Sequence, residues 1–324
     1  MTRYGFLGPE TTFTHQALLQ ALEARESTGT RTPPEQLQLV PVSTVAAAAA
    51  DLIAGDLDAL MAPIENSVEG GVSGTLDVLA ATDAITIVAE QVVPITFVLA
   101  AREPMALDQV ESVASHPHAQ AQVQGWLRTH LPDARIDAAS STAAAARDLA
   151  FCAPEDALGR TAVCSPLAAE HFGLHVLAHG IEDTVGAQTR FVLVQREGRI
   201  PARTGADRTT IVIKLAHDRA GALLEALELF NANGVNLSRI ESRPTGDALG
   251  RYSFSIDVEG HLEDRRVQAA LRDLHRVCPA VHFLGSYPRF DGTSSRAREG
   301  FEDSAYDTAV EWVRQLSSLI EPPQ

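Results

Sequence analysis

The sequence is poor in cysteine and in basic charge. The three cysteines, Cys152, Cys164 and Cys278, show no C-x-x-C spacing, which argues against a disulfide framework and a zinc site and favours a reducing compartment. Lys and Arg total 26 against 42 Asp and Glu, a net charge of -16, so broad attraction to nucleic acid or an anionic membrane is not expected. If the ligand is an anion, the positive field around it must be local.

Signals for export or membrane insertion are also missing. The start of the chain runs directly into a strand-like segment, 4–7, without the basic start and cleavage pattern of a signal peptide. An Ala-rich run near Ala46 is interrupted by Asp51 and Asp56, well short of the roughly 20 apolar residues that a membrane helix needs. We therefore expect a cytoplasmic protein without a membrane partner.

Short apolar runs alternate with Ala-rich helical segments up to about residue 195, which predicts an α/β domain with mainly parallel sheets. The expected strands are 4–7, 37–42, 59–64, 85–88, 95–100, 110–114, 161–164 and 190–195. Ser43 and Ser141 precede two of the helical runs and are expected N-caps, because their hydroxyls can accept a free backbone N–H. No G-x-G-x-x-G follows the first strand, which argues against a nicotinamide-dependent dehydrogenase.

Residues 196–208 are rich in Arg, Gly and Pro and predict a linker to a second unit, 209–288. Its elements are expected at 209–215 (strand), 221–233 (helix), 235–243 (strand), 251–259 (strand), 263–276 (helix) and 281–287 (strand). This βαββαβ order is ferredoxin-like. Apolar residues alternate with Ser253, Ser255 and Asp257 in the third strand, which predicts a sheet with one solvated face.

The segment 289–324 is expected to form a C-terminal tail. It is polar and rich in Gly and Ser before an amphipathic stretch at 306–319. We expect this last stretch to dock weakly or to pair with a partner.

Polar side chains follow two of the predicted strands. Glu65, Asn66 and Ser67 come after strand 59–64, at the position where open α/β sheets bind ligands, although Asn and Ser also serve as simple turn and cap residues. Ser115 and His116 follow strand 110–114, but neighbours in sequence rarely reach the geometry of a catalytic triad. A metal pair of His116 with His118 is equally poor, because no further ligands are visible.

A third polar segment, 183–191, is a Gly-containing loop that leads Thr189 and Arg190 into the strand 190–195. Taken alone, it is a loop that enters a strand.

Together these segments resemble prephenate dehydratase. The motifs that carry the resemblance are G-P at 8–9 before T-F-T at 12–14, P-I-E-N-S at 63–67 with T-L-D at 75–77, S-H-P at 115–117 with Gln122, S-T-A-A-A from Ser141, and T-R-F at 189–191. The second unit resembles an ACT domain, with G-A-L-L at 221–224 and E-S-R-P at 241–244. The likeness covers about residues 3–288. It implies a two-lobed, doubly wound, periplasmic-binding-protein-like catalytic domain at 1–195 and a ferredoxin-like ACT regulatory domain at 209–288.

The resemblance implies a carbon–oxygen lyase of L-phenylalanine biosynthesis, without cofactor or metal. Prephenate would lose carbon dioxide and water together to give phenylpyruvate, so the protein must hold two carboxylates, assist departure of the ring hydroxyl and exclude bulk water. The implied catalytic residues are Thr189, Asn66, Ser115 and Gln122. The implied substrate-binding residues are Glu65, Arg190, Ser67, Thr12 and Thr75. Arg190 is either a carboxylate partner, ordered by Glu65, or half of a structural ion pair.

The ACT resemblance implies feedback by L-phenylalanine bound between paired domains, and self-association to a dimer or tetramer. The implied effector-binding residues are Gly221, Ala222, Leu223, Asn236, Leu237, Glu241, Ser242, Arg243 and Pro244. Two alternatives stay open: an ACT domain that serves only dimerisation, and a non-catalytic amino-acid-sensing or solute-binding protein of the same two-lobed fold.

One residue departs from the family pattern. Thr11 stands where the family has glycine in G-P-x-G-T-F. Glycine there permits a positive φ, which Thr resists. If the loop needs this conformation to bind substrate, threonine is expected to lower the affinity.

Overall fold

The computed structural model describes residues 1–27, 36–215, 219–245 and 252–320. They fall into two compact units: Met1–Thr75 with Gln91–Leu193, and Leu76–Glu90 with Val194–Gln324. Within these described ranges, no helix has the length and apolarity that a bilayer crossing requires.

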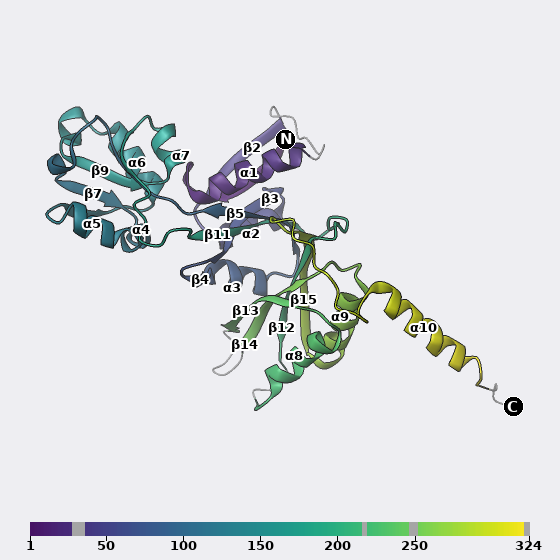
Figure 1. The fold of residues 1–324 in the computed structure, drawn as a ribbon. Helices are drawn as coiled ribbons and strands as arrows, with labels where there is room; N and C mark the ends of the chain where they lie inside the picture. Colours follow the sequence, from purple (N-terminus) through teal and green to yellow (C-terminus); the bar gives the residue numbers. More distant parts are fainter. Residues whose placement is uncertain (28–35, 216–218, 246–251, 321–324) are drawn as a thin grey trace. The chain divides into compact units, whose positions relative to one another are not determined.

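The first lobe is built on a sheet with the strand order β2-β1-β3-β11-β5 (Figure 1). Its strands are β1 (Thr2–Leu7), β2 (Leu37–Val42), β3 (Ala59–Asn66), β5 (Ile85–Pro94) and β11 (Gln188–Arg196), with the short β4 (Gly70–Gly71) on β3, and its helices are α1 (Phe13–Ser27), α2 (Val45–Ala54) and α3 (Ser73–Ala81). β1 pairs in parallel with β2 and β3, as the alternating pattern predicts. The strand expected at 85–88 continues to Pro94, so the next one begins only at Val98.

The helix α2 begins one residue later than the sequence predicts. Thr44, in an extended conformation, accepts the Ala47 N–H at 3.1 Å and is the N-cap. Ser43 is therefore not the cap, because the extended backbone at Thr44 already places a hydroxyl over the free N–H groups. The helix ends at Ala54 and is capped by Gly55, whose left-handed φ of 87° favours glycine.

The second lobe has a mixed sheet with the order β10-β6-β9-β7-β8. Its strands β7 and β9 and its helices α4, α5, α6 and α7 are labelled in Figure 1. Its elements are β6 (Val98–Ala101), β7 (Ser112–Ser115), α4 (Pro117–Gln122), α5 (Gln124–His130), β8 (Arg135–Ala138), α6 (Thr142–Phe151), β9 (Arg160–Cys164), α7 (Pro166–His171) and β10 (His175–His179). β7 runs parallel to β8 and β9, but β6 is antiparallel to β9 and to β10, so the expectation of mainly parallel sheets is wrong here. Ser141 caps α6 by accepting the Ala144 N–H at 2.9 Å, as predicted.

The sheet of the predicted ACT domain lies in the second unit, with the order β13-β14-β12-β15. The elements are β12 (Asp207–Lys214), α8 (Ala222–Ala232), β13 (Leu237–Pro244), β14 (Tyr252–Glu259), α9 (Arg265–Val277) and β15 (Ala280–Pro288), which confirms the βαββαβ order. All three strand pairings are antiparallel. α8 and α9 cover one face, where Phe230 and Val267 pack against Ile211 in a continuous apolar core.

The opposite face of this sheet is polar but not solvated, which corrects the prediction from its alternation. Ser253, Ser255 and Asp257 are all buried. Asp257 forms two hydrogen bonds with the guanidinium of Arg239, at 2.9 and 3.0 Å, and accepts another from the Thr210 hydroxyl at 2.8 Å. Alternation of polar and apolar residues along a strand shows that one face of the sheet is polar. It does not show that this face is exposed to solvent, because a charge that is paired and hydrogen-bonded can be buried.

Residues 76–90 belong to the same unit as the ACT sheet and contact its strands. Glu90 pairs with Arg208, and a side chain at Gly285 would collide with the Ile87 carbonyl. The exposed carboxylate of Asp77 accepts two hydrogen bonds from Arg243, at 2.8 and 2.9 Å.

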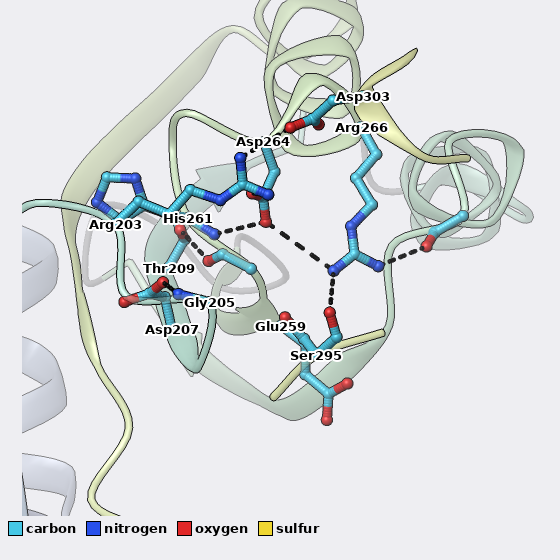
Figure 2. Close-up of polar contacts among 12 residues, drawn as sticks. Arg203, Gly205, Asp207, Thr209, Glu259, His261, Asp264, Arg266, Ser295 and Asp303 are labelled. Atoms are coloured by element: carbon cyan, nitrogen blue, oxygen red, sulfur yellow. Dashed lines mark hydrogen bonds and ion pairs between the residues drawn. The ribbon is translucent and has the colours of Figure 1, made fainter. Parts of the chain in front are cut away.

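The C-terminal segment of the described chain returns to α9. Figure 2 shows Arg203 and Arg266 converging on Asp264, and Arg203 also pairs with Asp303 at 2.7 Å. Asp303 opens the last helix, α10 (Asp303–Ser317), which confirms a helix in the predicted amphipathic stretch.

Candidate active site

A pocket of about 410 Å³ opens in the first unit and is lined from both of its lobes. Four residues of the predicted site contribute to its wall: Thr12, Asn66, Gln122 and Thr189. The other lining residues are Leu7, Gly8, Phe13, Thr14, Ser43, Pro63, Glu69, Ile95, Phe97, His116, His118, Ala119, Ser140, Ser141, Thr142 and Phe191. The volume lies within the range of small-molecule sites.

Asn66 and Thr189 form a direct hydrogen-bonded pair in this wall. The Asn66 amide donates to the Thr189 hydroxyl oxygen at 2.8 Å. The amide oxygen of Asn66 accepts the N–H groups of Val68 and Glu69 at 2.8 and 3.1 Å, so the turn fixes which way the amide points. Because the Thr189 oxygen already accepts from Asn66, its own proton can be donated to a ligand.

A second polar contact joins the two lobes across the pocket. Gln122, at the end of α4, donates from its amide to Glu69 at 2.9 Å. His118 lies on the other oxygen of the same carboxylate, at 3.5 Å. Glu69 and His118 were not among the residues predicted for the site, although Glu69 follows Asn66 on the same turn and could have been included.

The positive field of the pocket comes from backbone. Residues at or before the first turns of α1, α2 and α6 line the wall, namely Thr12, Ser43 and Thr142, and the N-terminus of a helix carries partial positive charge from its free N–H groups. Among the described lining residues there is no Arg or Lys, and Glu69 is the only carboxylate. Three helix N-termini therefore offer partial positive charge to an anionic ligand in an acidic chain.

His116 is the titratable group that the pocket perturbs. Burial lowers its pKa below the usual value, the neighbouring His118 adds to this, and Glu69 opposes it. The lowered pKa disfavours the charged form of His116, so this side chain contributes less positive charge to the pocket than an exposed histidine would.

Five of the nine predicted catalytic and substrate-binding residues do not line the pocket: Ser115, Ser67, Thr75, Glu65 and Arg190. Ser115 is fully buried and donates its hydroxyl to the Val163 carbonyl at 2.8 Å. Ser67 fixes its loop to β11, because its N–H donates to the Gln188 carbonyl and its hydroxyl accepts the Gln188 N–H, both at 2.9 Å. Thr75 is buried at the start of α3.

Arg190 and Glu65 form an ion pair beside the pocket. The guanidinium Nε lies 3.1 Å from the carboxylate, and the arginine side chain is only 8% exposed against 37% for the glutamate. The structure therefore shows the predicted pairing of Arg190 with Glu65. Neither residue lines the pocket, and the role of Arg190 toward a carboxylate ligand stays a prediction.

Thr11 adopts the conformation that the family glycine would suit. Its φ is +66° in a buried loop, where its N–H donates to His15 Nδ1 at 3.0 Å. Its carbonyl accepts the Ser165 hydroxyl of the second lobe at 3.2 Å. These two bonds hold a left-handed threonine next to pocket residue Thr12.

The predicted effector residues lie in the second unit. Gly221, with a φ of +84°, precedes the first residues of α8. Leu237 and the E-S-R-P run lie along β13, and Asn236 immediately precedes that strand. Their contact with an amino acid stays a prediction.

Comparison with known proteins identifies the family. A model of the family described as prephenate dehydratase matches residues 4–199, and a model of the ACT domain matches residues 209–276. Prephenate dehydratase of Mycobacteroides abscessus is 43% identical over 315 residues, which cover 97% of this chain and 98% of that protein. Prephenate dehydratase of Mycobacterium tuberculosis is 42% identical over 98% of this chain and 94% of its own length.

A solved structure extends the likeness to three dimensions. The crystal structure of prephenate dehydratase from Arthrobacter aurescens in complex with L-Phe superposes with a TM-score of 0.87 at 45% identity. It covers 98% of this chain and 100% of the Arthrobacter chain. The chain described here belongs to the prephenate dehydratase family, in the form that carries an ACT domain after the catalytic domain.

Proposed function

We propose that the pocket converts prephenate to phenylpyruvate with release of carbon dioxide and water, a carbon–oxygen lyase reaction that precedes L-phenylalanine. The observation that carries this proposal is the hydrogen-bonded pair of Asn66 and Thr189 in a pocket bordered by helix N-termini. The pair offers a neutral donor for a departing hydroxyl. The helix ends offer partial positive charge for two carboxylates.

The reaction breaks two bonds of the substrate. The bond from the ring to its carboxylate breaks and releases carbon dioxide, its electron pair enters the ring, and the carbon–oxygen bond opposite breaks as the ring becomes aromatic. The departing hydroxyl takes a proton and leaves as water. Thr189, which lines the pocket with its proton free of the Asn66 bond, donates to this oxygen while charge develops on it.

Asn66 supports that donation from the other side. Its amide donates to the Thr189 oxygen, so negative charge that moves onto this oxygen is stabilised by a hydrogen bond already in place. An unperturbed Thr hydroxyl is a very weak acid, so Thr189 hydrogen-bonds the departing oxygen and passes its proton to it only as the carbon–oxygen bond breaks and that oxygen becomes strongly basic. The Thr189 proton is replaced from water after product leaves. Gln122 orients the substrate from the second lobe. Ser115 has a positioning role: its hydrogen bond to the Val163 carbonyl holds the end of β7, from which the pocket residue His116 follows.

The carboxylates are assigned to the ends of the helices. The first turns of α1 and α6 line the pocket, and their N–H groups suit carboxylate oxygens. Arg190 follows Thr189 directly in the sequence, and its 3.1 Å pairing with Glu65 supports an ordered guanidinium beside the pocket as a second partner for a substrate carboxylate.

Feedback by L-phenylalanine is assigned to the ACT domain, in an oligomer formed through paired ACT domains in the cytoplasm. The Arthrobacter relative was solved with L-Phe. In this chain Arg243, of the predicted effector strand, pairs with Asp77 of α3, the helix that follows Asn66 along the chain. An effector that binds one arrangement more tightly can act through such a contact, and its differential affinity sets the largest possible effect.

The test uses the full chain with prephenate, and phenylpyruvate is read by its absorbance in alkali. Turnover is expected, with inhibition by L-phenylalanine. The matched control carries Asn66→Ala with Thr189→Val, which removes the donor pair and should abolish most turnover. Binding of prephenate without any phenylpyruvate would favour the alternative, a solute-binding protein of the same fold.

A further inference from the structure

The helix α10 carries an apolar stripe that no described part of the chain covers. The stripe consists of Ala305, Ala309, Trp312 and Leu316, spaced by four, three and four positions on one side of the helix, and Leu319 continues it in the following turn. α10 has no buried residue, and the side chains of Trp312 and Leu316 are 60% and 45% exposed. Continuous exposed apolar surface of this kind marks an interaction site.

The other side of α10 is fixed to its own unit. Asp303 accepts the N–H of Arg265 at 2.9 Å, and Asp307 pairs with the same arginine at 2.9 Å. The Tyr306 hydroxyl donates to the Asn233 carbonyl at 3.1 Å. Figure 1 shows the helix, in yellow, extending beyond the sheet and helices of its unit, so the stripe is presented on a held scaffold.

A hollow lies on the stripe side of the helix. It is lined by Ser304, Ala305, Thr308, Ala309 and Trp312. Four of these have the spacing i, i+3, i+4 and i+7, which is the four-residue hole that receives one side chain of a facing helix. The alanines make the hole deep, and Trp312 on its rim is the largest side chain available to fill such a hole.

We propose that the stripe pairs with the same stripe of a second copy of this chain, with the two helices antiparallel. When the twofold axis passes between residues 310 and 311, Trp312 enters the partner's hollow over Ala309, and Leu316 lies over Ala305. Each large side chain then meets a small one, and the two helices overlap along their whole length. A parallel pair would instead set Trp312 against Trp312 and alanine against alanine, which leaves gaps.

The charges on α10 favour protein over membrane as the cover. Asp303, Asp307 and Glu311 occupy the polar side, with Arg314 as the only cation of the helix. A helix that lies on a lipid surface carries Lys and Arg on its polar face, and the whole chain has a net charge of -16. The α10 interface is additional to the pairing of ACT domains proposed above, and it does not depend on the catalytic activity.

The first test is the dissociation of the full chain on dilution, followed by analytical ultracentrifugation. Trp312→Glu should raise the protein concentration at which the assembly dissociates by about tenfold or more, the effect of losing a buried aromatic anchor. The matched control Gln315→Glu adds the same charge beside the stripe and should leave that concentration within about threefold. Equal dissociation of Trp312→Glu and the native chain overturns the proposal. So does binding of the native chain to vesicles of anionic phospholipid in a co-sedimentation assay, if Trp312→Glu abolishes that binding and leaves the assembly intact.

The second test is disulfide formation, which reports the orientation of the helices. In a Cys152→Ser background, Ala305→Cys with Leu316→Cys should form a covalent dimer on mild oxidation. The control pair Asp307→Cys with Ser318→Cys has the same spacing on the side of α10 away from the stripe and should not. Each stripe cysteine alone should give no dimer, and efficient dimers from Ala305→Cys alone would show parallel helices and overturn the antiparallel pairing.

Discussion

Replacement of the Thr189 hydroxyl isolates the donor to which the reaction is assigned. Thr189→Val keeps the shape of the side chain, which is 7% exposed in β11, and exchanges the hydroxyl for a methyl group. Because the hydroxyl acts on charge that develops only in the transition state, we expect kcat to fall by about 10²–10³, while KM changes by less than about threefold.

The cost in stability should be small and separable from the loss of rate. The substitution leaves the Asn66 amide without its 2.8 Å partner, a loss of about 0.5–1.5 kcal/mol. For a unit of this size that corresponds to a Tm lower by about 2–4 °C per kcal/mol. Circular dichroism melts of both proteins measure this directly.

The control is Thr189→Ser, which restores the hydroxyl without the methyl group. Its kcat should lie within about tenfold of the native value, far above that of the valine variant. Initial rates of phenylpyruvate formation over a range of prephenate concentrations give both constants. A valine variant with native kcat would remove Thr189 from the mechanism, and a serine variant as slow as the valine one would show that shape and not the hydroxyl matters.

Three further predictions follow from single contacts. Asn66→Asp keeps an oxygen for the turn N–H groups but cannot donate to Thr189, so its kcat should fall by about 10² or more with the fold retained, and a native rate contradicts the donor role. Asp77→Asn weakens a half-exposed pair with Arg243, so the L-phenylalanine concentration for half-inhibition should rise by about two- to fivefold with basal kcat nearly unchanged; identical inhibition curves would exclude this contact from the response. Thr11→Gly relieves a left-handed threonine, which costs roughly 1–2 kcal/mol, but it gives up about 0.5–1 kcal/mol to the freer unfolded glycine and deletes a buried side chain whose hydroxyl donates to the Glu10 carbonyl. These effects oppose one another, so urea unfolding should show a change of less than about 1 kcal/mol, and a loss of more than about 2 kcal/mol would mean that the left-handed conformation stores little strain.

Most helices and strands could be predicted from the sequence, because their apolar residues recur at the regular spacing of a helix or a strand. The six elements of the ACT domain and strands such as β2 lie within a few residues of their expected positions. β4, β8 and β10 were not predicted: β4 is only two glycines, and β8 and β10 are short edge strands with two polar residues each among four and five. Their direction of pairing depends on tertiary contacts that no local pattern encodes.

Burial of the polar ACT face could not be predicted for the same reason. Residues 76–90 lie far from β14 in sequence, yet they belong to the same unit. The alternation of Ser253, Ser255 and Asp257 shows only that the face is polar. Arg239, which neutralises Asp257, lies on the neighbouring strand, and a strand register is needed to bring the two together.

The candidate site was predicted in part. Asn66 and Thr189 are 123 positions apart, and only the resemblance to a family placed them together before the structure did. The contribution of helix N-termini follows from where α1, α2 and α6 begin in space, which sequence does not give. Glu69, by contrast, lay within a recognised segment and was overlooked.

The most direct test of the account is a crystal structure of the Thr189→Val variant with prephenate, since slow turnover should preserve the substrate. The account predicts prephenate in the pocket of the first unit, with its ring hydroxyl at the residue 189 side chain and a carboxylate within about 3 Å of the N–H groups that open α6. Prephenate bound elsewhere, or with its hydroxyl turned away from residue 189, would contradict it.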